Sequence, residues 1–230
     1  MYAALAEVYD FLVPEALLSP EGRAAAFSEV TEELAPGARV LDCACGTGTL
    51  AVGLALLGFD VDASDASPEM VIRTRALAVL RGVDVWAEAR RWEELRGGPY
   101  DAVLCVGNSL THAKDRRMAL SGMRRVARDG ALLAITSRTW ERPQEAGEEV
   151  VERDGRRARV RRAWYDGDPR TLELEVTVDG EVFAERLEYW PFTHAELCED
   201  LRATGFEVAV STWDPDVDRY LVTALAQPST

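Results

Sequence analysis

The chain has 230 residues, of which 47% are apolar and 29% are charged, and its net charge at pH 7 is −14. This length and composition suit one sizeable α/β domain with a real hydrophobic core. The acidic balance argues against nucleic acid or an anionic membrane as the main partner, because both attract basic surfaces.

The sequence also argues against export, membrane insertion and metal binding. The N-terminus lacks the basic start and apolar run of a signal peptide, and no stretch of 18 apolar residues is present. We therefore expect a cytoplasmic protein. Cys43, Cys45, Cys105 and Cys198 lie in apolar stretches with no Cys/His cluster beside them. Buried, reduced thiols and no metal site are the expectation.

The first part of the chain alternates between predicted helix and predicted strand. Residues 1–36 are rich in Ala, Leu and Glu, and they predict a helical segment interrupted by Pro14, Pro20 and Gly22. Strands are then predicted over 39–44, 59–64, 83–89, 100–106 and 131–137, and helices over 49–57, 68–80 and 115–127. This alternation predicts βαβ units and a parallel sheet.

The pattern changes after residue 142. Residues 150–189 alternate between apolar and polar, with turn signals at "RDGR", "YDGDP" and "VDGE", and this predicts inserted antiparallel hairpins. A helix over 193–204 and a closing pair of strands over 206–212 and 219–226 follow. We expect a single domain, 1–230, in four parts: an N-terminal helical lid (1–36), a cofactor-binding core (37–142), an inserted β lid (143–192) and a C-terminal helix with the closing strands (193–230).

A glycine loop follows the first predicted strand. "GTGTLA", Gly46–Ala51, fits the pattern G-x-G-x-x-G/A, in which glycines let the backbone turn tightly and approach a ligand. Asp65 ends the second strand, where a carboxylate can bind both ribose hydroxyls. NAD and S-adenosylmethionine both need these features. Asp42, directly before the loop, favours S-adenosylmethionine, because a carboxylate repels a pyrophosphate and attracts the ammonium of a methionine tail. A seven-stranded sheet with an antiparallel closing pair favours it too.

Three segments carry a family resemblance. "VLDCACGTG" (40–48) with "DASPEM" (65–70) resembles motifs I and II of class I S-adenosylmethionine-dependent methyltransferases. "CVGNSLTH" (105–112) and "RLEYWPF" (186–192) narrow the resemblance to the glycine and glycine/sarcosine N-methyltransferases, over roughly residues 38–206. It implies a Rossmann-like α/β fold, with a seven-stranded methyltransferase sheet, an N-terminal helical segment and an inserted antiparallel β lid.

The resemblance also implies a set of cofactor-binding residues. These are Asp42, Ala44, Gly46, Gly48, Asp65, Ala66, Met70, Arg91, Trp92, Val106 and Arg23, the last of which would meet the carboxylate of S-adenosylmethionine. The relatives have an Asn or Asp before the tryptophan, where this chain has Arg91. Because Arg cannot accept a hydrogen bond from the adenine amino group, we expect backbone groups or Glu88 to recognise adenine.

For the methyl acceptor, we expect His112, in a polar loop at the carboxyl end of a strand, and Arg186, whose role the resemblance implies, as catalytic residues. The implied substrate-binding residues are Tyr9, Asn108, Thr139, Arg186, Tyr189 and Trp190, with Tyr2 and Tyr9 in the N-terminal lid. In the relatives the position of Arg186 holds the substrate carboxylate, a role that suits the guanidinium fork. Strand alternation puts Arg186, Glu188 and Trp190 on one face, where we expect an acceptor pocket. Thr139 stands where the family has an Asn. His112 is the first candidate for a base if the nucleophile is a hydroxyl.

One basic run needs a separate interpretation. "GRRARVRR" (155–162) could contact RNA, but Asp166, Asp168, Glu173 and Glu175 follow on the next predicted strand and can pair with it. The expected function is therefore methyl transfer from S-adenosylmethionine to a nitrogen of a small, carboxylate-bearing molecule such as glycine or sarcosine. Two alternatives stay open: an O- or N-methyltransferase of natural products with a ring substrate, and a non-catalytic regulator that binds the cofactor.

Overall fold

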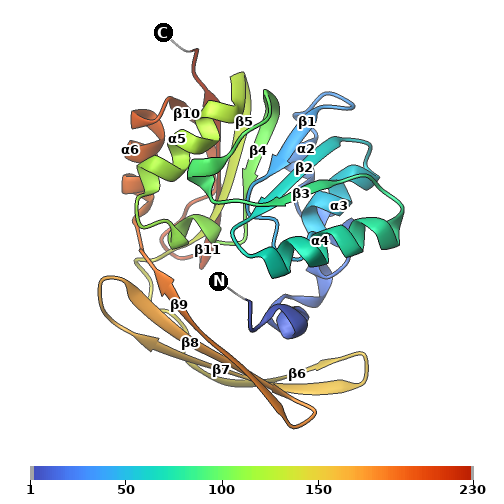
Figure 1. Cartoon of the computed structure of the whole chain (residues 1–230). Helices are drawn as coiled ribbons and strands as arrows, with labels where there is room; N and C mark the ends of the chain where they lie inside the picture. The colour runs from blue at the N-terminus through green and yellow to red at the C-terminus, as the bar shows by residue number, and fades with distance from the viewer. Residues whose placement is uncertain (1–2, 229–230) are drawn as a thin grey trace.

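The computed structural model describes residues 3–228 and contains two separate β-sheets (Figure 1). The larger sheet has seven strands in the order β10-β11-β5-β4-β1-β2-β3. Its strands are β1 (Arg39–Asp42), β2 (Asp60–Asp65), β3 (Trp86–Ala89), β4 (Tyr100–Cys105), β5 (Ala127–Arg138), β10 (Phe206–Ser211) and β11 (Arg219–Ala226). Strands β1 to β5 pair in parallel, whereas β11 is antiparallel to β5 and β10 is antiparallel to β11. The predicted parallel sheet with an antiparallel closing pair is confirmed.

Helices cover both faces of this sheet. The longer ones are α3 (Thr49–Leu56), α4 (Pro68–Arg81), α5 (Arg116–Val126) and α6 (His194–Ala203). One buried core joins the sheet to α5 and α6, and a second joins its other face to α3. The predicted N-cap of α4 is confirmed, because the Ser67 hydroxyl accepts a hydrogen bond from the Met70 N–H and Pro68 opens the helix.

The N-terminal segment consists of short pieces. It contains the 3₁₀ turns η1 (Ala6–Leu12) and η2 (Glu15–Leu17) and the short helices α1 (Pro20–Ala25) and α2 (Ser28–Thr31). The prolines account for the breaks, since neither Pro14 nor Pro20 can donate a hydrogen bond to a preceding turn. Two more 3₁₀ turns, η3 (Trp92–Glu94) and η4 (Ser109–His112), follow β3 and β4.

The smaller sheet is the predicted insertion of hairpins. Its strands, in the antiparallel order β6-β7-β8-β9, are β6 (Gly147–Arg153), β7 (Arg156–Tyr165), β8 (Arg170–Val178) and β9 (Glu181–Tyr189). Its apolar face packs on Leu5, Val8 and Phe11 of the N-terminal segment. Figure 1 shows this segment between the two sheets, so the smaller sheet covers the end of the larger one.

The basic run of β7 lies on the small sheet and is matched by acids. Arg159 and Arg162 form ion pairs with Glu148 and Glu149 of β6, and Arg161 stands opposite Glu175 of β8. The sequence predicted acids of the following strand as partners, and the structure adds those of the preceding strand. No helix within residues 3–228 is long and apolar enough to cross a membrane.

Candidate functional site

Two cavities meet at the carboxyl ends of β1, β2 and β4, where open α/β sheets bind ligands. The small cavity has a volume of about 70 Å³ and the large cavity about 970 Å³. Ala44 and Ser109 line both of them. The small cavity also contains Tyr9, Asp10, Arg23, Asp42, Gly46, Val106 and Gly107, and the large one Cys43, Asp65, Ala66, Arg91, Trp92, His112, Lys114, Arg116, Glu188, Trp190 and Asp200.

The glycine loop is held against Asp65. The Gly46 and Ser67 N–H groups donate to the two carboxylate oxygens of Asp65, at 3.0 and 2.9 Å. Gly48 has φ +88°, and a Cβ there would lie 2.8 Å from Thr74 of α4. A side chain at this position would therefore push the loop away from the helix. Asp65 stands at the wall of the large cavity with its carboxylate already oriented by the backbone.

The small cavity brings together Asp42 and Arg23, which carry opposite charges. Asp42 is 1% exposed, and its carboxylate accepts a long hydrogen bond, 3.4 Å, from the Ala44 N–H. Burial raises the pKa of Asp42 to about 7, although the positive charge of Arg23 partly offsets this effect. A buried carboxylate with only one long hydrogen bond would be stabilised by a cation bound beside it. An ammonium beside Asp42 and a carboxylate beside Arg23 are the two charges of an α-amino acid, so the small cavity fits a methionine tail.

The large cavity adjoins the small one at Ala44 and Ser109. Asp65, Ala66, Arg91 and Trp92 are among the residues that line it. The Trp92 indole N–H donates to the Cys43 carbonyl oxygen at 2.9 Å, which fixes the ring beside the loop. Val106, another predicted cofactor-binding residue, lines the small cavity.

Three predicted cofactor contacts are placed differently. Gly48 and Met70 line neither cavity; Met70 is 2% exposed and lies in α4 behind the loop. Glu88 forms ion pairs with Arg90 and Arg96 and lines a separate hollow beside β2 and β3, so the expectation that it recognises adenine is wrong.

His112 stands at the junction of the two sheets. Its Nδ1 lies 2.7 Å from the Glu188 carbonyl oxygen, and its ring is 4.4 Å from that of Tyr189, both residues belonging to β9. Since a carbonyl can only accept, Nδ1 carries the proton and Nε2 is an acceptor. Burial lowers the pKa of His112 to about 4, so the imidazole is neutral at physiological pH.

The other predicted acceptor residues are divided among different places. Tyr9 lines the small cavity and Trp190 the large one. Tyr189 is 5% exposed and packs among His112, Trp140 and Trp164.

Asn108 and Thr139 are buried and line neither cavity. Asn108 uses its side-chain oxygen to accept from the Arg138 N–H at 2.9 Å, so it fastens the loop after β4 to β5. Thr139 is 1% exposed and lines neither cavity. Tyr2 lies outside the described residues.

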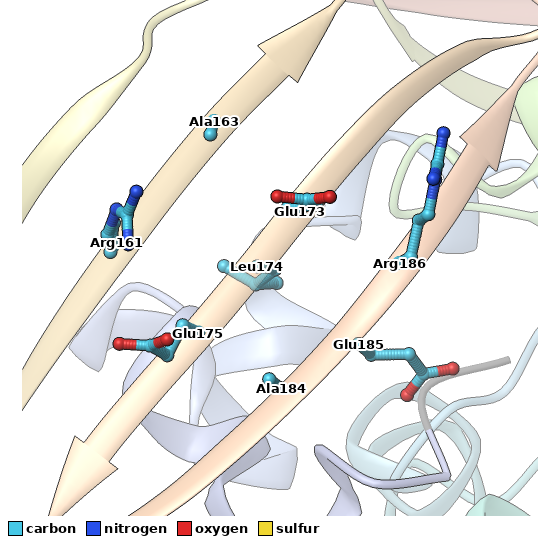
Figure 2. Close-up of a pocket in the computed structure, with 8 residues that line it drawn as sticks. All are labelled: Arg161, Ala163, Glu173, Leu174, Glu175, Ala184, Glu185 and Arg186. Carbon is cyan, nitrogen blue, oxygen red and sulfur yellow. The ribbon is translucent and has the colours of Figure 1, made fainter.

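Arg186 does not reach either cavity, so its predicted place in the acceptor pocket is wrong. Figure 2 shows its side chain on β9 beside Glu173 of β8, its register partner, in a hollow of about 280 Å³ on the outer face of the small sheet. The predicted alternation holds, because Leu187 and Tyr189 lie on the opposite face. That opposite face is the buried one, however. Glu188 and Trp190 still line the large cavity, because β9 ends there and the Trp190 N–H bonds to the Thr111 carbonyl oxygen.

This placement makes Arg186→Lys a test of the geometry. We expect kcat/KM for the methyl acceptor to change less than about twofold, because an exposed strand arginine contributes little beyond its surface charge. Steady-state kinetics of the wild type and the variant provide the measurement. A tenfold loss with unchanged cofactor affinity would show that the small sheet moves to bring Arg186 to the acceptor.

Several polar residues of the large cavity were not predicted from the sequence. Arg116 and Arg117 of α5 donate to the buried carboxylate of Asp200 in α6, at 2.7 and 2.6 Å. Ser109 lines both cavities. Its place in the "GNSLTH" loop could have identified it from the sequence, whereas no sequence pattern indicates that α5 and α6 are joined by ion pairs. Among residues 3–228 no three His, Cys, Asp or Glu side chains gather as metal ligands would.

Part of this chain is similar in sequence to known proteins. A family model described as "Methyltransferase domain" matches residues 40–130. The glycine/sarcosine N-methyltransferase of Parasynechococcus marenigrum (strain WH8102) is 37% identical over 126 residues, covering 52% of this chain and 45% of the relative. The glycine N-methyltransferase of Oryctolagus cuniculus is 35% identical over 122 residues, covering 45% and 41%. The chain thus matches less than half the length of these curated relatives.

Solved structures match over nearly the whole chain. An S-adenosylmethionine-dependent methyltransferase from Clostridium acetobutylicum ATCC 824 superposes with a TM-score of 0.80 at 16% identity, covering 99% of both chains. CalS10, an amino pentose methyltransferase from Micromonospora echinaspora, gives 0.77 at 22% identity, covering 99% of this chain and 98% of its own. Residues 40–130 thus match a methyltransferase domain, the chain is similar in sequence to glycine and glycine/sarcosine N-methyltransferases, and it shares the fold of S-adenosylmethionine-dependent methyltransferases.

Proposed function

We propose that this protein transfers a methyl group from S-adenosylmethionine to the nitrogen of a small-molecule amine. The observation that carries the proposal is the pair of joined cavities, one with the charges that complement an amino acid and the other ending at a neutral imidazole. When bound, S-adenosylmethionine would supply a methyl group bonded to a positively charged sulfur. The lone pair of the amine can attack the methyl carbon, and the sulfur leaves as a neutral thioether.

The residues of the small cavity and the glycine loop would hold the cofactor. Asp42 and Arg23 would bind the ammonium and the carboxylate of its methionine tail. Asp65 would accept hydrogen bonds from the ribose hydroxyls, since each of its oxygens now accepts one backbone N–H and has capacity for another donor. Arg91 and Trp92 would flank the adenine.

The state of His112 supports nitrogen over oxygen as the nucleophile. A hydroxyl must lose its proton to react, and a base with a pKa of about 4 takes that proton poorly at neutral pH. A neutral amine needs only alignment and exclusion of water. In this proposal Nε2 of His112 accepts a hydrogen bond from the amine N–H and so orients the lone pair.

We favour a carboxylate-bearing amine as the acceptor, because the sequence relatives are named for glycine and sarcosine. One observation favours a second class, the amino sugars. The large cavity of about 970 Å³ exceeds what adenosine and glycine together need, and CalS10, an amino pentose methyltransferase, matches this chain from end to end.

Calorimetry and a methyl-transfer panel test the proposal together. We expect S-adenosylhomocysteine to bind more tightly than NAD, and labelled methyl from S-adenosylmethionine to reach glycine, sarcosine or an amino sugar but not a phenol. Tighter NAD binding would contradict the cofactor assignment. Transfer only to phenols would establish the ring-substrate alternative, and binding without transfer to any acceptor would favour the regulator.

The pH dependence of kcat/KM should show whether ionisation of the acceptor amine or of His112 controls the rate. At saturating S-adenosylmethionine, kcat/KM for the acceptor should rise about tenfold per pH unit up to the pKa of the acceptor ammonium, because only the neutral amine reacts. No inflection is expected near 6.5, since burial keeps the pKa of His112 at about 4. An inflection between 6 and 7 that His112→Gln abolishes would make His112 a base.

A further inference from the structure

The face of the large sheet that packs against α5 and α6 is only partly covered by helices. The core cluster on this face draws on β1, β4, β5, β10 and β11, and within residues 3–228 it includes no residue of β2 or β3. The connection from β3 to β4, which the structure describes throughout, holds the 3₁₀ turn η3 in place of an α-helix. The sheet face over β2 and β3 is therefore open.

The hollow beside β2 and β3 lies over this open part. Trp86 is the register partner of Asp62, and Glu88 is that of Ser64, so the four side chains share one face of the sheet. All four residues line the hollow, whose volume is about 300 Å³. This volume lies at the lower end of small-molecule pockets, about 300 to 1,000 Å³, and is enough for a single substituted ring.

The hollow has an apolar floor and an aromatic rim. Leu41, Leu95 and Tyr100 line it and are buried. Trp86, in contrast, is 68% exposed. The face of an indole is a stacking surface for another planar ring. The hollow therefore offers an aromatic ring both a buried apolar base and a stacking partner.

The charged groups of the hollow are already paired with one another. The Asp62 carboxylate accepts a hydrogen bond from the Tyr100 hydroxyl at 2.6 Å. The Glu88 carboxylate forms ion pairs with Arg90 and, at 3.5 Å, with Arg96. A charged ligand would have to replace one of these partners, so the hollow favours an uncharged ligand.

One polar group of the hollow has no partner. Ser64 is 3% exposed, and among the described residues its hydroxyl oxygen has no hydrogen-bond partner. A buried hydroxyl in this state costs free energy, which a bound group that donates or accepts a hydrogen bond would recover. The Trp86 ring and the Ser64 hydroxyl thus lack partners, whereas the charges beside them do not.

We propose that this hollow is a second ligand site, which binds a small uncharged aromatic ring carrying one hydrogen-bonding group. The ring would stack on Trp86, and its polar group would bond to the Ser64 hydroxyl. The site is distinct from the two cavities of the proposed methyl transfer, although Arg90 lines both the hollow and the large cavity. It goes beyond the proposed function and does not depend on it.

Phenol is the probe for this site, and NMR of the indole N–H signals reports its binding. The Trp86 signal is the one that Trp86→Leu removes, and we expect phenol to shift it. Toluene, cyclohexanol and benzoate should bind at least about fivefold more weakly than phenol, because they lack the polar group, lack the aromatic ring and carry a charge, respectively. In Ser64→Ala, the preference for phenol over toluene should disappear. The matched control is Tyr165→Leu, which removes an exposed aromatic of the small sheet and should bind phenol like the wild type.

Thermal unfolding and cofactor competition complete the test. Ser64→Ala should have a Tm at least equal to that of the wild type, because it removes a hydroxyl without a partner; a lower Tm would mean that the hydroxyl serves the fold. Saturating S-adenosylhomocysteine should leave phenol bound, whereas displacement would make the hollow part of the cofactor space. An unmoved Trp86 signal, or benzoate binding as tightly as phenol, overturns the site. None of these outcomes bears on the proposed function, which the binding of S-adenosylhomocysteine tests by itself.

Discussion

Replacing Asp65 with alanine is expected to weaken the binding of S-adenosylhomocysteine by about 30- to 700-fold. Two charge-assisted hydrogen bonds to the ribose would be lost, together worth about 2–4 kcal/mol. The same carboxylate fastens the glycine loop through Gly46 and Ser67, so the loop loses its anchor as well. Titration calorimetry measures the change. Asp65→Asn keeps one acceptor oxygen, so its affinity for S-adenosylhomocysteine should lie between those of the wild type and Asp65→Ala.

The matched control for this prediction is Asp60→Ala. Asp60 opens the same strand at its other end and pairs with Arg39 at the surface. Its removal should leave the affinity within about twofold. Equal weakening in the two variants would mean that the loss comes from a damaged β2 and not from the ribose contact.

Cofactor binding should also release a proton from Asp42. Burial raises the pKa of this carboxyl to about 7 in the free protein, so near neutral pH about half of the molecules carry the proton. An ammonium beside Asp42 favours the ionised form and lowers its pKa. The affinity for S-adenosylhomocysteine should therefore be level above about pH 8 and fall by up to tenfold per unit below 7.

Two measurements check this linkage. At pH 7 the heat of binding should differ between phosphate and Tris by about half of the difference in their ionisation enthalpies, and Asp42→Asn should remove that difference. In addition, a folded-state pKa raised from 3.8 to about 7 stabilises the free protein below pH 3.8 and loses that contribution as pH rises through 7. The ligand should therefore raise Tm more at pH 8 than at pH 6. Identical heats in both buffers would place the cofactor's ammonium elsewhere.

The sequence predicted the hairpins and the sheet well because local signals encode them. "RDGR" and "VDGE" form turns in which Asp154, Gly155, Asp179 and Gly180 all have positive φ, a conformation that Asp and Gly tolerate. Strand ends carrying Asp42 and Asp65 meet at one edge of any parallel sheet, so their proximity also followed from the pattern.

The acceptor side was predicted less well because it depends on which face of the small sheet is buried. Alternation separated Arg186 from Leu187 and Tyr189, but only the packing of Leu5, Val8 and Phe11 against the sheet decides which set points inward. The apolar series Leu172, Leu174, Val176 and Val178 on the neighbouring strand was the missed signal.

The insertion of the small sheet between β5 and α6 has an evolutionary consequence. The chain leaves the α/β core after Arg138 and returns at Trp190. The four strands of the small sheet are therefore connected to the core at only two points of the chain. Most of the residues proposed to hold the cofactor lie within residues 40–130, the part that the family model matches, whereas Glu188 and Trp190 bring the end of the insertion to the large cavity. Changes in the hairpins can therefore retune acceptor choice while the donor half stays intact. Exchange of hairpin inserts between such enzymes is accordingly a natural route to new acceptors.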